Sequence, residues 1–109
     1  MHFLITGTDT RVGKTMLGCA LAFAFKVRGM RVGVMKPVET GCAEAEGALA
    51  PADGPALIAS ASSSLPIALV SPYRYRSTLP PAAAAEADSA SPHEFRGTLP
   101  HPSRYCRPQ

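Results

Sequence analysis

Residues 7–15 read Gly-Thr-Asp-Thr-Arg-Val-Gly-Lys-Thr, between a short apolar run at 3–5 and a helix-like run at 16–27. The order of strand, glycine-containing loop, Lys-Thr and helix is typical of a phosphate-binding loop. In such a loop, successive backbone N–H groups point at an anion, and the following helix adds its positive N-terminal end. We therefore expect Lys14 to contact the outer phosphates of a nucleotide and the Thr15 hydroxyl to bind magnesium.

The loop departs from the usual pattern G-x-x-x-x-G-K-[ST] at its first position, which is Thr8, while the glycine stands one place earlier at Gly7. The alternative is a plain strand–turn–helix in which Lys14 and Thr15 merely open a helix. The flanking segments favour the phosphate loop, because they supply the context that the motif requires. We therefore assign a nucleotide site to residues of this loop and the start of its helix, namely Arg11, Val12, Gly13, Lys14, Thr15 and Met16.

Length and composition set further bounds on the protein. The 109 residues are enough for one small domain, and the 46% hydrophobic content suits a globular chain, although 11 prolines and 6% aromatics leave few bulky side chains. The net charge of +3, without a Lys/Arg stripe among aromatics, does not indicate a nucleic-acid partner. Three cysteines without C-x-x-C spacing predict neither a disulfide framework nor a zinc site, and a reducing cytoplasm is the expected compartment.

The apolar run at 16–25 follows two basic residues and ends in Ala-Phe-Ala, an arrangement that imitates a signal peptide. Against this alternative, a strand-like segment and a glycine loop precede the run, which continues into Lys26 and Arg28 as an amphipathic helix. A membrane span is not expected, because it needs about twenty apolar residues.

The first 36 residues follow a strand–helix–strand pattern. We predict a buried strand at 2–6, a helix at 14–28 with Gly29 as its C-terminal cap, and a second strand at 31–35. Such a βαβ unit has parallel strands and a right-handed crossover, and its ligands bind beyond the carboxyl ends of the strands. Lys36 stands at such an end, so it should face the same crevice as Lys14.

The remainder of the chain gives weaker patterns. We expect a loop at 39–54 in which Glu44 and Glu46 are solvated, a helical turn or two at 55–61, a turn at 62–66, a strand or core plug at 67–70, a connector at 72–76 and a short helix at 82–87. From Ser89 the proline-rich sequence has no regular period, so 89–109 is predicted to be an irregular, disordered tail. A metal site at His93, His101 and Cys106 is not favoured, because their spacing matches no common ligand pattern.

Three segments together resemble the N-terminal half of a known family. Residues 5–15 (ITGTDTRVGKT), 19–22 (CALA) and 36–41 (KPVETG) are similar to dethiobiotin synthetase, with weaker likeness at 52–57, 64–66 and 71–75. The resemblance covers roughly residues 1–88 and accounts for Thr8 at the first loop position. It implies a P-loop NTPase-like α/β fold, a parallel sheet with flanking helices, of which this chain holds one βαβ unit and part of the remainder.

The resemblance also implies an activity. Enzymes of this family carboxylate 7,8-diaminononanoate with CO2 and close a ureido ring with MgATP, in biotin biosynthesis. They are typically homodimers. By the same resemblance Lys36 is the catalytic lysine, Asp53 contacts magnesium and nucleotide together with Thr15, and Thr40 and Thr10 contact the substrate. For Asp53 the alternative is an exposed loop carboxylate, and for Thr40 a turn hydroxyl.

The chain also departs from the family. The family's chain is much longer, and its second half carries an acidic, glycine-rich motif and further strands that are absent here. Residues after Asp88 do not resemble it. We therefore expect an incomplete sheet and do not expect full catalytic competence from this chain alone. A non-catalytic fragment and another P-loop ATPase remain as alternative readings.

Overall fold

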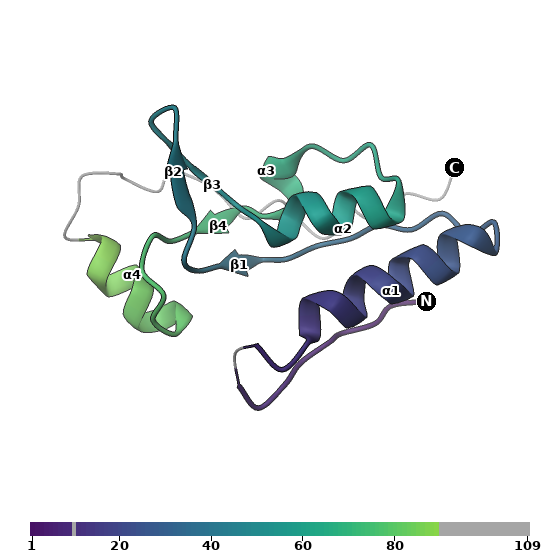
Figure 1. The fold of residues 1–109 in the computed structure, drawn as a ribbon, viewed down its shortest axis with the longest axis horizontal. Helices are drawn as coiled ribbons and strands as arrows, with labels where there is room; N and C mark the ends of the chain where they lie inside the picture. The colour runs from purple at the N-terminus through teal and green to yellow at the C-terminus, as the bar shows by residue number, and fades with distance from the viewer. Residues whose placement is uncertain (10, 90–109) are drawn as a thin grey trace.

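A computed structural model describes residues 1–9 and 11–89 of the chain. It has a mixed α/β fold, shown in Figure 1. In chain order the elements are α1 (Lys14–Val27), β1 (Val38–Glu39), β2 (Ala43–Ala45), β3 (Ala48–Ala50), α2 (Asp53–Ala61), α3 (Ile67–Val70), β4 (Tyr73–Arg74) and α4 (Pro81–Ser89). Thr10, residues 90–109 of the predicted tail, and the three residues of the disfavoured metal site lie outside the described residues.

The parallel sheet is small and is formed by β1 and β4. Val38 pairs with Tyr73 and Glu39 with Arg74. Backbone hydrogen bonds extend the pairing on either side: the Lys36 N–H donates to the Val70 carbonyl at 2.7 Å, and the Tyr75 N–H donates to the Glu39 carbonyl at 2.9 Å. α2 and α3 lie in the connection between the two strands, as expected for parallel neighbours that need a long crossover.

The prediction that 2–6 and 31–35 form the strands of the sheet is wrong. The described residues form two two-stranded sheets, and neither segment belongs to one. The predicted burial also fails at the N-terminus, where Phe3 is 60% and Leu4 is 91% exposed. An apolar run is compatible with a buried strand, but the run becomes a strand only where a distant segment accepts its backbone hydrogen bonds.

The predicted first helix is confirmed within one residue. Gly13 precedes α1 with a left-handed φ of +97°, which a residue with a Cβ would adopt only with strain. At the other end, the Gly29 N–H donates to the Lys26 carbonyl at 2.9 Å and the Met30 N–H to the Phe25 carbonyl at 3.1 Å. This pair of bonds is a Schellman motif with glycine at φ +78°, so the predicted cap is also confirmed.

The segment predicted as a loop at 39–54 contains a β-hairpin. β2 and β3 pair antiparallel, with Ala43 opposite Ala50 and Ala45 opposite Ala48. The two turn residues, Glu46 and Gly47, both have positive φ angles, of 52° and 78°, as a type I′ hairpin turn requires. This hairpin was difficult to predict, because alanine is depleted in strands and Glu-Gly is not a favoured turn pair.

The later elements agree better with the predictions made from the sequence. α2 begins two residues before the predicted helix, and α4 includes the predicted helix at 82–87 with Pro81 at its start. Residues 67–70 form the short helix α3 instead of a strand, but Val70 is completely buried, as a core plug would be.

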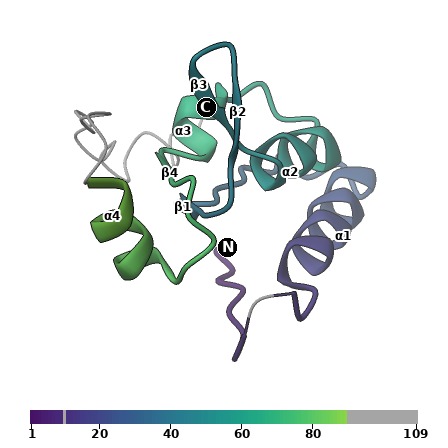
Figure 2. The ribbon, with the colours of Figure 1, turned by 60° about the vertical axis from the view of Figure 1, so that its left-hand side comes forward.

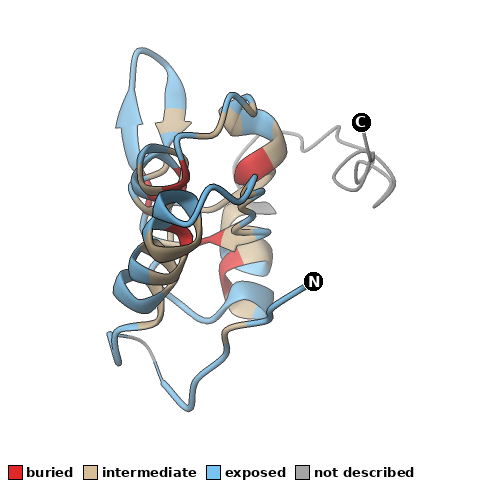
Figure 3. Ribbon diagram, turned by 90° about the vertical axis from the view of Figure 1, so that its right-hand side faces the viewer, coloured by how far each residue is buried: buried red, intermediate tan, exposed pale blue. Residues whose placement is uncertain are grey.

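The core lies where α2 meets α1, α3 and the parallel strands. Helices α1 and α2 lie side by side in Figures 1 and 2, and Figure 3 shows the buried residues on the inward faces of the elements. A Cβ on Gly18 would stand 3.3 Å from Leu57 Cδ2, so the absence of a side chain allows the two helices close contact. Of the buried apolar residues, Ala22, Leu57, Ala61 and Val70 belong to α1, α2 and α3, whereas Cys42 lies between β1 and β2 and Ala84 lies in α4. None of the described helices has the length and apolar character needed to cross a membrane.

Candidate phosphate and metal site

The glycine loop leads directly into the N-terminus of α1. The Gly13 carbonyl accepts the first intrahelical bond, from the Leu17 N–H at 2.9 Å, and the first turn of α1 carries no acidic side chain. The Lys14 Nζ donates to the backbone carbonyl of Asp9, so this side chain folds back across the loop. A helix end with free N–H groups, a lysine beside it and no carboxylate in its first turn favours binding of an anion.

Gly7 has a steric role in this loop. A Cβ built on it would stand 3.0 Å from Val12 Cγ2 and 3.1 Å from Lys14 Cδ. The lysine stem therefore crosses the loop directly against the backbone of Gly7. This contact gives a physical reason for a glycine one place before the position at which the usual pattern has it.

A second part of the site joins three residues that are far apart in the sequence. The Thr15 hydroxyl donates to Asp53 Oδ2 at 2.9 Å, and Lys36 Nζ forms an ion pair with the same oxygen. Lys36 Nζ also lies 3.4 Å from Thr15 Oγ1. Thr15 stands in the first turn of α1, Lys36 shortly before β1, and Asp53 at the start of α2. The side chains of the lysine and the aspartate are about one-third exposed, so the cluster remains accessible to solvent.

The environment of Asp53 favours its ionised form. Burial acts to raise the pKa of Asp53, but hydrogen bonds from Lys36 and Thr15 and the charge of Lys36 outweigh it. The pKa therefore lies below its ordinary value of 3.8. The carboxylate is negative at neutral pH, as a ligand of a hard cation must be.

The other predicted site residues that the structure describes lie along the loop, at the start of α1 and after β1. Arg11, Val12 and Met16 are exposed along the loop and the start of α1, while Lys14 is half-buried. Thr40 follows β1 and is half-buried, and none of the hydrogen bonds recorded for the described residues joins it to the cluster. The substrate roles of Thr40 and Thr10 stay predictions.

The donor set fits magnesium better than a softer metal. Among the described residues there is no group of three or more His, Cys, Asp or Glu side chains that could hold a metal ion. Magnesium needs no such group, because it retains several waters and takes one or two protein oxygens together with phosphate oxygens. The Thr15 hydroxyl and the Asp53 carboxylate, 2.9 Å apart, are oxygen donors of that kind.

Sequence reasoning missed Glu39, which is buried beneath the cluster with 5% of its surface exposed. Its Oε1 accepts the N–H groups of Ala52 at 2.6 Å and Asp53 at 2.8 Å. Its Oε2 accepts the Gly54 N–H at 3.3 Å and the Ser71 hydroxyl at 3.1 Å. The available signal was an acidic residue at the end of an apolar segment, ahead of a helix without an N-cap side chain.

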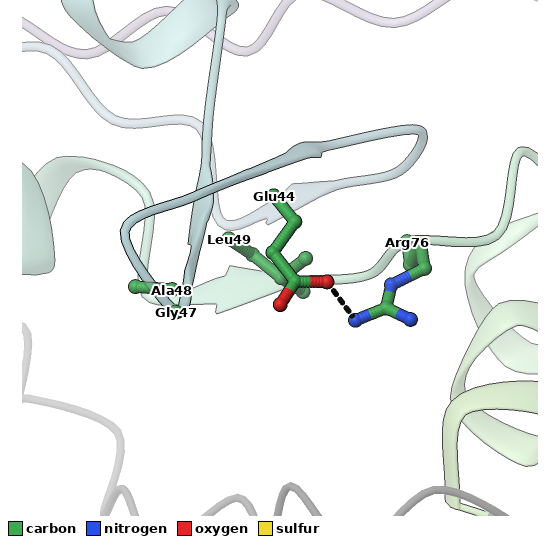
Figure 4. A pocket seen from close by; sticks show the side chains of 5 residues that line it. All are labelled: Glu44, Gly47, Ala48, Leu49 and Arg76. Carbon is green, nitrogen blue, oxygen red and sulfur yellow. Dashed lines mark hydrogen bonds and ion pairs between the residues drawn. The ribbon is translucent and has the colours of Figure 1, made fainter.

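A separate pocket lies beside the hairpin, between β2, β3 and the segment after β4 (Figure 4). It is lined by Glu44, Gly47, Ala48, Leu49 and Arg76. The Arg76–Glu44 ion pair across it, at 2.6 Å, joins side chains that are about half exposed, and such surface pairs contribute little to stability. This pocket contains none of the predicted site residues.

Asp53→Asn should make the free energy of unfolding fall less steeply as the pH is lowered into the acid range. Because the pKa of Asp53 is lower in the folded state, the folded chain binds fewer protons than the unfolded chain around that pKa. Its stabilising effect is therefore present above the ordinary pKa of 3.8 and is lost as the pH falls through the folded value. Urea unfolding between about pH 5 and pH 2 should show a shallower decline for Asp53→Asn than for the natural chain. The exposed Glu46→Gln serves as control, and parallel curves for Asp53→Asn and the natural chain would contradict the assignment.

A first comparison with known proteins gives the family to which the chain belongs. A protein-family profile described as an AAA domain matches residues 1–102, and the chain belongs to that family.

Three similar curated proteins are more specific, and each of the three is named an ATP-dependent dethiobiotin synthetase. The chain is 38% identical to the protein of Thermodesulfovibrio yellowstonii over 79% of this chain and 36% of that one. It is 42% identical to that of Aeromonas hydrophila, over 81% of this chain and 39% of the relative. The corresponding values for Escherichia coli K12 are 39%, 84% and 36%. The predicted resemblance is thereby confirmed as homology, and the chain spans less than two-fifths of the length of these relatives.

Proposed function

We propose that residues 1–88 form the part of an ATP-dependent dethiobiotin synthetase that binds the phosphates of ATP and carries the catalytic lysine. The observation that supports this most directly is the cluster of Thr15, Lys36 and Asp53. These residues meet beside the glycine loop although 38 positions separate the first from the last. Homology to proteins named ATP-dependent dethiobiotin synthetase supplies the reaction.

In the proposed reaction, CO2 adds to one amine of 7,8-diaminononanoate to form a carbamate. The carbamate oxygen then takes the γ-phosphoryl group of ATP, and ADP leaves. The second amine attacks the carbamoyl carbon, which closes the ureido ring and releases phosphate. The phosphoryl transfer brings several negative charges together, so positioning and charge neutralisation are the main contributions that the protein can make.

The roles of Lys14, Lys36, Thr15 and Asp53 are proposed from their positions in the site, and those of Thr40 and Thr10 from the family resemblance alone. Lys14 and the N–H groups at the start of α1 hold the β- and γ-phosphates. Lys36 stands between phosphate and carbamate and neutralises the charge that develops on transfer. Thr15 and Asp53 hold magnesium, which screens the phosphate oxygens when bound. Thr40 and Thr10 contact the carbamate or the diamine. As in the family, the whole enzyme would be a cytoplasmic homodimer acting on small molecules.

A chimera tests this proposal. Residues 1–88 replace the aligned segment of the Escherichia coli relative, whose remaining sequence supplies the parts that this chain does not span. The purified chimera is assayed with ATP, bicarbonate and 7,8-diaminononanoate, and dethiobiotin is quantified by mass spectrometry. We expect dethiobiotin formation that depends on both magnesium and ATP.

Two other outcomes would reject the proposed reaction. A folded chimera that binds ATP but forms no dethiobiotin would favour another P-loop ATPase. A folded chimera that neither binds ATP nor forms product would favour a non-catalytic segment. Fold is checked by circular dichroism against the intact relative, so that failure of chemistry is separated from failure of folding.

A further inference from the structure

We propose that Glu39 is the positioning residue of this site: its buried carboxylate fixes the first turn of α2 and thereby holds Asp53 against Thr15 and Lys36. The placement of Asp53 by Glu39 depends only on contacts within this chain. The catalytic consequence of that placement rests on the proposed function.

The hydrogen bonds of Glu39 are those that such a role needs. It stands at the end of β1, and its carboxylate accepts three consecutive N–H groups, of Ala52, Asp53 and Gly54, at 2.6, 2.8 and 3.3 Å. α2 has no side-chain N-cap of its own, so these otherwise unsatisfied donors depend on a carboxylate from another element. Hydrogen bonds between a carboxylate and backbone N–H groups are among the stronger ones in proteins.

A second set of contacts fixes Glu39 itself. The fully buried Ser71 hydroxyl lies 3.1 Å from Glu39 Oε2 and 3.3 Å from the Lys36 carbonyl. β4 begins two residues after Ser71 and pairs with β1, so the carboxylate is held from two neighbouring segments. Asp53 is thereby positioned through Glu39, and the Lys36 backbone is held beside it because its N–H donates to the carbonyl of Val70, which precedes Ser71.

The packing of α2 leaves little room for another arrangement. A Cβ on Gly54 would stand 2.7 Å from Ile67 Cδ1 and 3.2 Å from Ser71 Cβ and Oγ. The first turn of α2 is thus in direct contact with Ser71, and a glycine permits that approach. Because Asp53 precedes this glycine, its backbone position is set by the same contact.

The N-termini of α1 and α2 also differ in their electrostatic environment. The positive end of α2 is already neutralised by the buried Glu39 carboxylate, whereas the first turn of α1 has no acidic residue. An anionic ligand should therefore bind at α1, and α2 should contribute the Asp53 side chain instead of its backbone N–H groups. Burial, and after it the nearby Glu39, raises the pKa of the Cys42 thiol.

Chemical footprinting of the full 109-residue chain without ligand tests the inference. Acetic anhydride is added in trace amounts, and acetylation of Lys36 is measured by mass spectrometry relative to the exposed Lys26. In the natural chain the Asp53 ion pair should keep Lys36 less reactive than Lys26. In Glu39→Gln, which retains the shape but places an amide group among the N–H donors, the Lys36/Lys26 ratio should rise several-fold. Glu44→Gln, at an exposed glutamate, should leave the ratio unchanged.

Hydrogen exchange provides the readout that separates positioning from general destabilisation. In Glu39→Gln, the amides of Asp53 and Gly54 should exchange faster while those in the middle of α1 keep their protection. An unchanged Lys36/Lys26 ratio in folded Glu39→Gln would overturn the proposal. If that variant does not fold, Ser71→Ala and Glu39→Asp decide instead, and a natural ratio in both would overturn it.

ATP binding is measured separately on the natural chain. If the footprint changes as expected but the natural chain does not bind MgATP, the positioning role stands and the proposed function fails. If the chain binds MgATP but Glu39→Gln does not change the footprint, the positioning role fails and the proposed function is unaffected.

Discussion

Alanine at position 14 is expected to lower the affinity of the chain for MgATP by about 10- to 100-fold, because hydrogen bonds to charged groups contribute about 1.5–3 kcal/mol each. Lys14 is the cation nearest to the start of α1 in sequence, and its stem already lies across the loop against Gly7. The substitution removes the charge that faces the outer phosphates and leaves the N–H groups of the loop in place. Isothermal titration calorimetry of the natural chain and of Lys14→Ala measures the difference directly.

Lys26→Ala is the matched control for this experiment. Lys26 belongs to the same helix but stands in its last turn, exposed and far along the helix from the loop. The control removes the same charge from the chain, so a general electrostatic effect would weaken ATP binding equally in both variants. Unchanged affinity in Lys14→Ala, with a folded chain, would reject the phosphate-loop assignment.

The second large effect is expected at Lys36. In the chimera, Lys36→Ala should lower kcat by about 10²–10³-fold, the range found when one preorganised charge or donor is removed from a transition state. The affinity for MgATP should change much less, because Lys14 and the loop still hold the nucleotide. Steady-state kinetics together with calorimetry therefore separates a catalytic lysine from a binding one.

Arg76→Ala controls for the loss of an ion-paired cation. Arg76 pairs with Glu44 at the surface beside the hairpin, and its removal should alter neither kcat nor nucleotide affinity. A Lys36→Ala chimera with the natural kcat would show that Lys36 has a structural role through Asp53. Equal losses in kcat and ATP affinity would contradict the separation of roles between Lys14 and Lys36.

The features that the sequence predicted well are local ones. The helix at 14–28 was predicted from apolar residues at helical spacing, a basic last turn and Gly29 as its cap, and α1 matches it because these signals act over a few positions. Pro81 at the start of α4 is a signal of the same kind. The short motif KPVETG and the glycine loop also carried the predicted resemblance, because their order along the chain is itself distinctive.

The features that were missed depend on partners far away in the sequence. The parallel strands are Val38–Glu39 and Tyr73–Arg74 instead of 2–6 and 31–35, since pairing was decided by which backbones could meet around α2 and α3. Glu39 was expected only as the first residue of the loop predicted at 39–54 and had no assigned role. Its role became visible only when the N-terminus of α2 was placed against its carboxylate.

By itself, the sequence predicted a phosphate loop and the helix that follows it, and its resemblance to dethiobiotin synthetase pointed to Lys36 and Asp53. The helix could be predicted because its ends are set by residues within a few positions, where backbone conformation is nearly local. The tertiary structure alone brought Thr15, Lys36 and Asp53 to one point and set Glu39 beneath them. The physical reason is that a buried carboxylate must have its hydrogen bonds satisfied, and the donors that satisfy it here lie 13 to 32 positions away along the chain.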